Sequence, residues 1–104
     1  MCSSDLQDDT VNIGADANAQ NNQGTYGIAI GRSAAFTTQG EDSIAIGRSA
    51  GQSHQSGGAI AIGTQAGANV QYVNAVAIGN QAGFTAQGPN SVAIGYQEIG
   101  RAHV

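Results

Sequence analysis

A short hydrophobic motif recurs along this chain at a constant interval. The tetrapeptide [Ile/Val]-Ala-Ile-Gly begins at residues 28, 44, 60, 76 and 92, so successive copies lie 16 residues apart, and a weaker copy, VNIG, occupies residues 11–14. Below, position 1 of each repeat is the first residue of this motif. Recurrence at a fixed period indicates a repeat architecture. It outweighs the Gly-, Ala-, Gln- and Asn-rich composition, which alone is typical of low-complexity segments.

Large apolar residues alternate with a small one inside the motif. Positions 1 and 3 are Ile or Val, position 2 is always Ala, and position 4 is always Gly. This period of two, closed by Gly, predicts a short β-strand that ends in a turn. One repeat has room for two short strands and two turns, so we predict an all-β, parallel β-roll or β-solenoid of about six 16-residue coils. Helical repeats are disfavoured because Gly and β-branched residues each cost a helix roughly 0.5 to 1 kcal/mol.

The motif also predicts which side chains fill the interior. We expect the large residues at positions 1 and 3 to point inward and the Ala at position 2 to face outward. Two large side chains per coil make a thin core, and an outer face of Ala lets another subunit approach closely. We therefore expect the chain to form oligomers. The predicted core is Ile28, Ile30, Ile44, Ile46, Ile60, Ile62, Val76, Ile78, Val92 and Ile94. The predicted turn glycines are Gly31, Gly47, Gly63, Gly79 and Gly95.

A glutamine recurs at position 12 of each repeat. Stacked amides of this kind form hydrogen-bonded ladders along parallel strands, which is the interpretation we favour, while a ligand-binding comb is the alternative. Phe36 and Phe84 share position 9 and are expected to pack in turns or at an interface. Tyr72, in the divergent turn VQYVN, is a candidate contact with a partner, together with the two Phe residues. The predicted ladder consists of Gln39, Gln55, Gln71 and Gln87.

Charged residues are few. The chain has three Lys or Arg against seven Asp or Glu and a formal net charge of −4, with no lysine, so it lacks the basic surface that nucleic acids require. Arg32 and Arg48 share position 5, one coil apart, and we expect Glu41 and Asp42, which lie between them in sequence, to compensate them. No apolar run approaches the roughly 20 residues of a membrane span, so we expect no direct membrane insertion.

One segment spells a catalytic motif. GRSAG at residues 47–51 matches the G-x-S-x-G nucleophile elbow, with Ser49 as the nucleophile and His54 and Asp42 as the nearest possible partners. The repeat contradicts this interpretation, because a nucleophile would not be replaced by Gln in neighbouring coils. Zinc, phosphate-loop and GGxGxD calcium patterns are also missing from the sequence, so we expect no enzyme activity, no cofactor and no metal. Ser49 occupies position 6 of its repeat. The residues at position 6 of the other repeats are Ser33, Gln65, Gln81 and Gln97.

The two ends of the chain are related in an unusual way. EIGRAHV at residues 98–104 can be encoded by DNA whose reverse complement, read from a GTG start codon, gives MCSSDL, which is residues 1–6. That DNA matches a common short-read sequencing adapter. We therefore interpret 1–6 and 98–104 as sequencing-adapter artefact and 7–97 as the repeat segment of a longer protein. Cys2, the only cysteine, belongs to the artefact, so no disulfide is expected.

The recurring segments SIAIGRSAG, AIAIGTQAG and SVAIGYQ resemble the head repeats of trimeric autotransporter adhesins, the YadA-like heads, over residues 11–97. The resemblance implies a left-handed β-roll, a homotrimer, and a place on the bacterial cell surface, anchored to the outer membrane. It also implies attachment to host extracellular matrix or a surface receptor. The family repeat is typically shorter than the 16 residues found here. Similar repeats occur in tail-fibre and surface proteins of phages and viruses, which makes a virion-surface fibre the alternative.

An ice-binding solenoid is a more distant alternative. Such proteins present a flat array of Thr, whereas position 10 here is only partly Thr. Its occupants are Thr37, Ser53, Asn69 and Thr85.

Overall fold

The structure is a computed structural model that describes residues 10–17 and 26–97. Over these ranges the chain forms ten short strands and no helix. The two predicted adapter segments, residues 1–6 and 98–104, lie outside the described residues, so their interpretation as artefact stays a prediction.

The strands form two parallel sheets. Sheet A contains one strand from each copy of the motif, in the order β1-β2-β4-β6-β8-β10, and sheet B contains β3-β5-β7-β9. Each complete coil therefore contributes a three-residue strand to sheet A and a two-residue strand to sheet B. The predicted all-β parallel solenoid is confirmed. The bounds in sheet A are β1 Val11–Ile13, β2 Ile28–Ile30, β4 Ile44–Ile46, β6 Ile60–Ile62, β8 Val76–Ile78 and β10 Val92–Ile94. Those in sheet B are β3 Thr38–Gln39, β5 His54–Gln55, β7 Val70–Gln71 and β9 Ala86–Gln87.

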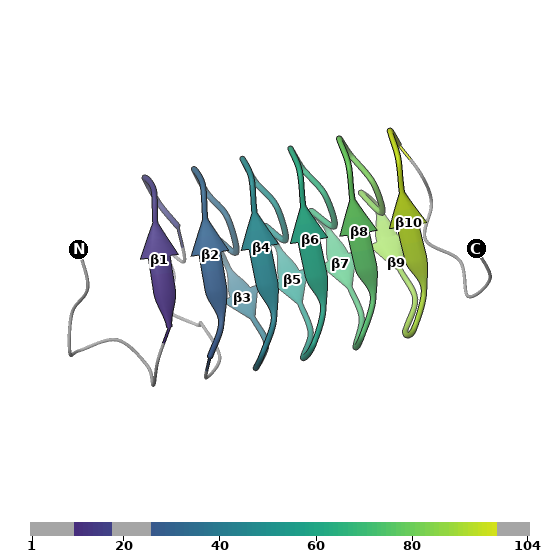
Figure 1. Cartoon of the computed structure of the whole chain (residues 1–104), viewed down its shortest axis with the longest axis horizontal. Coiled ribbons are helices and arrows are strands. Elements are labelled where there is room, and N and C mark those ends of the chain that lie inside the picture. Colours follow the sequence, from purple (N-terminus) through teal and green to yellow (C-terminus); the bar gives the residue numbers. More distant parts are fainter. Residues whose placement is uncertain (1–9, 18–25, 98–104) are drawn as a thin grey trace.

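Equal positions of successive coils stack in columns. Ile44 pairs with Ile60 and Gln55 with Gln71, and the other pairs keep the same register, apart from the 17-residue step between β1 and β2. In Figure 1 the strands of sheet A run upward in front, the chain crosses over the top, descends through sheet B behind, and advances to the right. The solenoid is therefore left-handed, as the resemblance implied, and it is an exception to the usual right-handed crossover.

The turn that follows each strand of sheet A is fixed by glycine. Gly63 has a φ of 126°, and a Cβ there would lie 2.7 Å from the carbonyl oxygen of Gly79 in the next coil. No L side chain is tolerated at that φ and that distance together. Two further positions of the same turn also have positive φ, as at Ser49 (60°) and Gly51 (55°). The predicted turn glycines thus occupy a column in which each backbone closely approaches the next.

The predicted direction of the strand side chains is wrong. The Ala at position 2 points inward, and Ala45, Ala61 and Ala77 have no solvent exposure, whereas the large residues on either side point outward. Most of these large residues are half-buried, and Ile94 is 60% exposed. The residues predicted as core that instead form the outer face of sheet A are Ile28, Ile30, Ile44, Ile46, Ile60, Ile62, Val76, Ile78, Val92 and Ile94.

The reason for the inversion is that the interior is narrow and already occupied. Alternation along a strand places position 2 on the face opposite positions 1 and 3. Sheet B fills the space across from it with glutamine, and the largest fully buried side chains are the four Gln of position 12. Only a methyl group fits between such a side chain and the strand of sheet A. The hydrophobic core therefore consists of alanines, from position 2 and from the following turn, such as Ala61 and Ala66.

Candidate interaction surfaces

The glutamines of position 12 form a continuous chain of hydrogen bonds inside the solenoid. Nε2 of Gln71 donates to the carbonyl oxygen of Ile60 at 2.6 Å, to that of Ala75 at 3.1 Å, and to Oε1 of Gln87 at 3.0 Å. Gln39 and Gln55 make the equivalent bonds to their own neighbours. Each amide thus ties sheet B to sheet A and one coil to the next. Since these side chains are buried, they offer no surface to a ligand in solvent.

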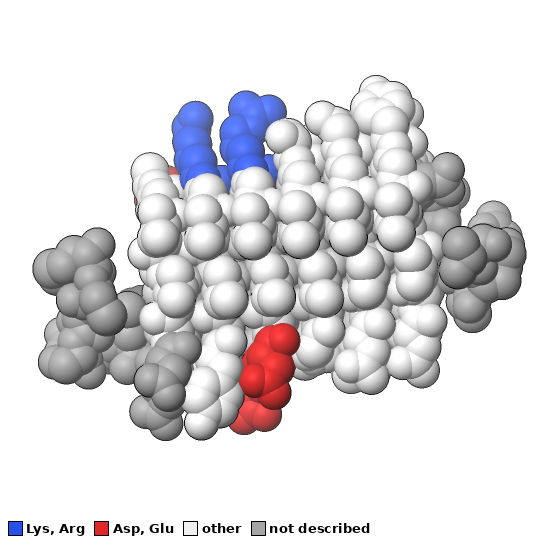
Figure 2. All heavy atoms as spheres, in the orientation of Figure 1, with Lys and Arg blue, Asp and Glu red and all other residues white. Residues whose placement is uncertain are grey.

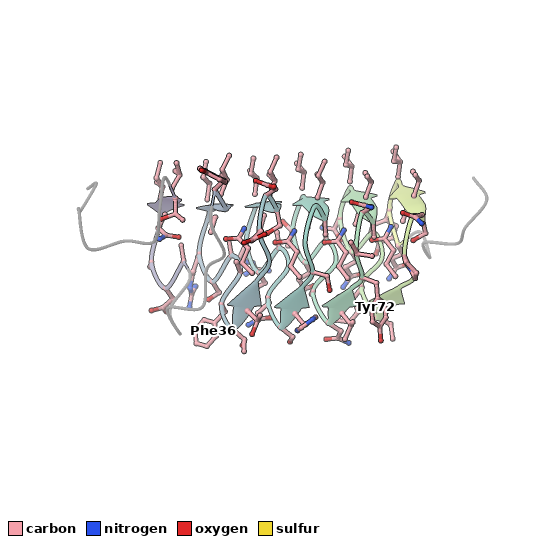
Figure 3. All side chains as sticks on the ribbon, turned by 90° about the horizontal axis from the view of Figure 1, so that it is seen from below. Phe36 and Tyr72 are labelled. Atoms are coloured by element: carbon pink, nitrogen blue, oxygen red, sulfur yellow. The ribbon has the colours of Figure 1, made fainter. Side chains whose placement is uncertain are left out.

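The outer face of sheet A is a continuous apolar surface, called the apolar face below. Two large aliphatic side chains project from each strand, in pairs along the whole solenoid (Figure 3). In Figure 2, which faces this sheet, no charged residue interrupts the rows of side chains between the two edges. A flat aliphatic array of this extent is typical of a surface that another protein covers. The apolar face comprises Val11, Ile13, Ile28, Ile30, Ile44, Ile46, Ile60, Ile62, Val76, Ile78, Val92 and Ile94.

The residues predicted as contacts lie on the opposite side of the solenoid. Phe36 and Tyr72 both project from the side of sheet B, well apart along the axis (Figure 3). Tyr72 and its neighbour Val73 are 49% and 46% exposed, while Phe36 and Phe84 are half-buried. Because Phe36, Tyr72 and Phe84 come from three different coils, the structure does not gather them into one site.

The two arginines and the acidic pair Glu41 and Asp42 lie on opposite edges of the solenoid, while Asp16 lies on the edge of the arginines. Arg32 and Arg48 follow β2 and β4, whereas Glu41 and Asp42 precede β4. Figure 2 shows the two arginines side by side on the upper edge, with some acidic atoms partly hidden behind them, and the main acidic group on the lower edge. The expected compensation of the arginines by these carboxylates is therefore absent from the structure. Nearness in sequence was misleading, because the strand of sheet A separates the two turns.

A second amide ladder, not anticipated from the sequence, runs along the upper edge. Nε2 of Gln81 donates to Oε1 of Gln65 at 3.0 Å, and Nε2 of Gln97 donates to Oε1 of Gln81 at 2.8 Å. These three residues share position 6 with Ser33 and Ser49. The recurrence of Gln at this position in three successive coils was the signal that could have revealed it.

Ser49 lies in the same column as the glutamines of the edge ladder. It is half-buried, its backbone N–H donates to the carbonyl oxygen of Arg32 at 2.8 Å, and its successors in the column are the glutamines of the edge ladder. His54 is exposed at the start of β5, in the other sheet. No group of three or more His, Cys, Asp or Glu that could hold a metal ion occurs within residues 10–17 and 26–97. Over the same ranges, no helix is long and apolar enough to cross a membrane.

Comparison with known families gives one match, in two overlapping copies. Residues 57–82 and residues 73–97 each match the YadA head domain repeat. No curated protein and no solved structure matches the chain. The matched region contains β6, β8 and β10 with their part of the apolar face. The 16-residue register of the strands extends back from this region to β2. Residues 57–97 of this chain are thus similar to YadA head domain repeats.

Proposed function

We propose that this chain is part of the head of a trimeric autotransporter adhesin, displayed on a bacterial cell surface, where it attaches the cell to a host or another surface without catalysing a reaction. The similarity of residues 57–97 to YadA head domain repeats supports the family-level part of this proposal. The left-handed parallel solenoid supports it over the remaining coils. The apolar face is the observation that carries it.

The distribution of apolar groups favours assembly. The interior of one chain is filled by Ala methyl groups and Gln amides, so most of the large aliphatic side chains lie outside it. Full burial of an Ile or Val side chain is worth about 1.5 to 3 kcal/mol relative to exposure. A single chain leaves much of this free energy unrealised, because every strand of sheet A presents two such side chains to solvent. Association through the apolar face would recover it.

A second and third copy of the same chain are the partners that fit this face best. The paired Ile and Val residues recur once per coil in strict register, so a covering surface must repeat with the same spacing along the axis. An identical solenoid has that spacing, and rotational symmetry places the same face of each copy at a common axis. In a homotrimer of this kind, sheet B and both edges would remain outside, where residues such as Tyr72 are free to contact a host matrix protein or receptor.

The assembly is tested by light scattering of the full chain. We expect a trimer for the natural sequence and a monomer with an unchanged β circular dichroism spectrum for the double variant Ile46→Asp, Ile62→Asp. Thr37→Asp with Thr85→Asp is the matched control, because both residues are exposed and lie away from the apolar face. We expect this control to remain trimeric. A stably folded monomer of the natural chain would refute the homotrimer.

The adhesive role needs a separate measurement. Binding of the natural chain to surfaces coated with extracellular matrix proteins should be detectable, and it should weaken strongly in the monomeric double variant, because a trimer engages a coated surface at several points at once. A trimer that binds none of the coated surfaces would contradict the adhesive role while leaving the assembly intact.

A further inference from the structure

The upper edge of the solenoid carries two arginines one coil apart, Arg32 and Arg48, and one carboxylate, Asp16, in the turn that precedes that of Arg32. We infer that this edge is a binding site for a linear anionic polysaccharide, with Arg32 and Arg48 holding its sulfate or carboxylate groups. This inference rests on the proposed adhesive function in one respect, since it gives that function a class of ligand. The geometry of the site belongs to a single chain and does not depend on the trimer.

The two arginines are held at a fixed separation by the backbone. The N–H of Ser49 donates to the carbonyl oxygen of Arg32, and the N–H of Gln65 donates to that of Arg48, both at 2.8 Å. Neighbouring parallel strands lie about 4.8 Å apart, so the two side chains start about 5 Å from one another. Both are exposed, and they extend side by side from the edge in Figure 2. The solenoid thus presents two parallel guanidinium groups.

This arrangement is unfavourable for folding. Like charges on directly neighbouring strands repel, and the carboxylates of Glu41 and Asp42 lie on the opposite edge. Asp16 lies one coil before Arg32 and two coils before Arg48. In a chain whose formal net charge is −4, the only two arginines of the repeat segment occupy the same position of successive coils. Arg48 has no carboxylate in its own turn or in the turns of the two adjacent coils on that edge, so a ligand is expected to supply the compensating negative charge there.

The chemistry of the pair selects the ligand. A guanidinium group is a planar fork of donors that bonds two oxygens of one anionic group, and carboxylate, sulfate and phosphate all present such oxygens. The same column continues along the axis with Thr64, Asn80 and Tyr96, which supply a hydroxyl, an amide and an aromatic ring that is 68% exposed. These groups suit the hydroxyls and ring faces of sugars. A straight row along the solenoid fits an extended polymer better than a compact ligand.

The loss test uses the full chain and immobilised heparin, with unsulfated hyaluronan as a second surface. We expect affinity for heparin to fall about tenfold between about 50 and about 200 mM salt, as for two neutralised charges per chain. Arg32→Gln with Arg48→Gln should abolish binding and its salt dependence. Thr37→Asp with Thr85→Asp changes the net charge equally on another surface and should retain most of the binding. Equal losses in the two double variants would overturn the inference.

A gain test follows from the repeat. Thr64→Arg places a third guanidinium in the same column and should raise the affinity for heparin about fivefold to tenfold, close to one further charge contact. Thr37→Arg adds the same charge on the side of sheet B and should raise it less. Equal gains, or binding of single-stranded DNA as tight as that of heparin, would show non-specific attraction and overturn the inference.

The two surfaces separate the anionic groups. Binding to heparin alone supports sulfate recognition, binding to both supports a site that also accepts carboxylate, and binding to neither overturns the inference. Light scattering measures the oligomeric state of every variant, so a failure of polysaccharide binding is distinguished from a failure of trimer formation. A trimer that binds no polysaccharide refutes the edge site only.

Discussion

The outward-facing residues of the two sheets differ in how regularly they recur from coil to coil, whereas the inward-facing residues of both sheets recur regularly. On sheet A, the outward positions hold Ile or Val in every coil, whereas on sheet B the corresponding column reads Thr38, His54 and Val70. The inward positions of both sheets are nearly constant, with Ala on sheet A in every strand but β1, where it is Asn12, and Gln on sheet B. Packing within one chain explains why the inward residues recur. It does not explain why the outward residues of sheet A are always Ile or Val.

A surface that repeats as strictly as the interior is under the same kind of constraint as the interior. On sheet A this constraint is consistent with burial against identical copies, while the varied face of sheet B is consistent with solvent and with partners that differ from coil to coil. The comparison therefore distinguishes the apolar face, which is the proposed assembly side, from sheet B and the two edges, which form the proposed recognition side. The variants below test this division, beginning with the connection between the two sheets.

Gln71→Ala should have the largest effect on stability. It removes the bonds from Nε2 to Ile60, Ala75 and Gln87 and leaves buried acceptors on both sheets without this donor. Each buried polar group deprived of its partner costs about 1 to 3 kcal/mol, so we expect a loss of about 4 kcal/mol in the free energy of unfolding. Urea denaturation followed by circular dichroism measures it.

The matched control for that variant is Gln81→Ala, in the ladder on the upper edge. It removes the same side chain from a partly exposed column, where water replaces the lost bonds, and should cost about 1 kcal/mol or less. If the two variants were equally destabilised, the interior ladder would not be the element that joins the sheets.

Gly63→Ala is expected to rank second. The added Cβ would meet the backbone of Gly79 at 2.7 Å, in a backbone conformation that L residues avoid, so we expect a loss of about 3 kcal/mol. Gly88→Ala is the control after sheet B, since a Cβ there meets nothing within 4 Å. The melting temperature should fall clearly in the first variant and hardly at all in the second. A similar fall in both would indicate a general intolerance of Ala and not a crowded column after sheet A.

The sequence predicted the periodic features of this fold. It did not predict which strand side chains face inward, because that depends on the distance between the two sheets. A spacing of 16 residues, Ile-Ala-Ile alternation and a closing Gly were sufficient for the strands, the turns and the parallel stacking. Alternation specifies that position 2 opposes positions 1 and 3, but it does not specify which of them faces inward. That depends on the distance between the sheets, which is set by the bonds that Gln55 and its equivalents make across the interior.

The candidate sites show the same limit. The column shared by Arg32 and Arg48 was evident from the repeat, but their separation from Glu41 and Asp42 was not, since nearness in sequence carries no information about which end of a strand a turn occupies. The outward face of Ile and Val was hidden by the ordinary expectation that large apolar residues fill the core. In a coil this narrow, that expectation reverses.

Thr38→Ile with His54→Ile should convert part of sheet B into a copy of the apolar face. The two residues are direct neighbours on β3 and β5, and outward substitutions in a strand change stability by only about 1 kcal/mol. We expect folding to be retained and a concentration-dependent self-association to appear beyond the trimer, which light scattering detects. Thr38→Gln with His54→Gln is the polar control and should show none. Unchanged association in the first variant would mean that aliphatic side chains alone do not define an assembly side.

Ser49→Ala is expected to have the smallest effect of the series. Ser49 lies on neither outward sheet face, and its backbone N–H, which bonds the carbonyl oxygen of Arg32, is retained by Ala. Its positive φ is shared by Ser33 in the preceding coil and by Gln65 in the following one, so the column accepts side chains of quite different size. The free energy of unfolding should therefore change by less than about 0.5 kcal/mol, and trimer formation and polysaccharide binding should stay the same. A variant that folds, assembles and binds polysaccharide normally but loses another activity would restore GRSAG as a chemical site, whereas loss of polysaccharide binding alone would place Ser49 in the site of the adjacent Arg48.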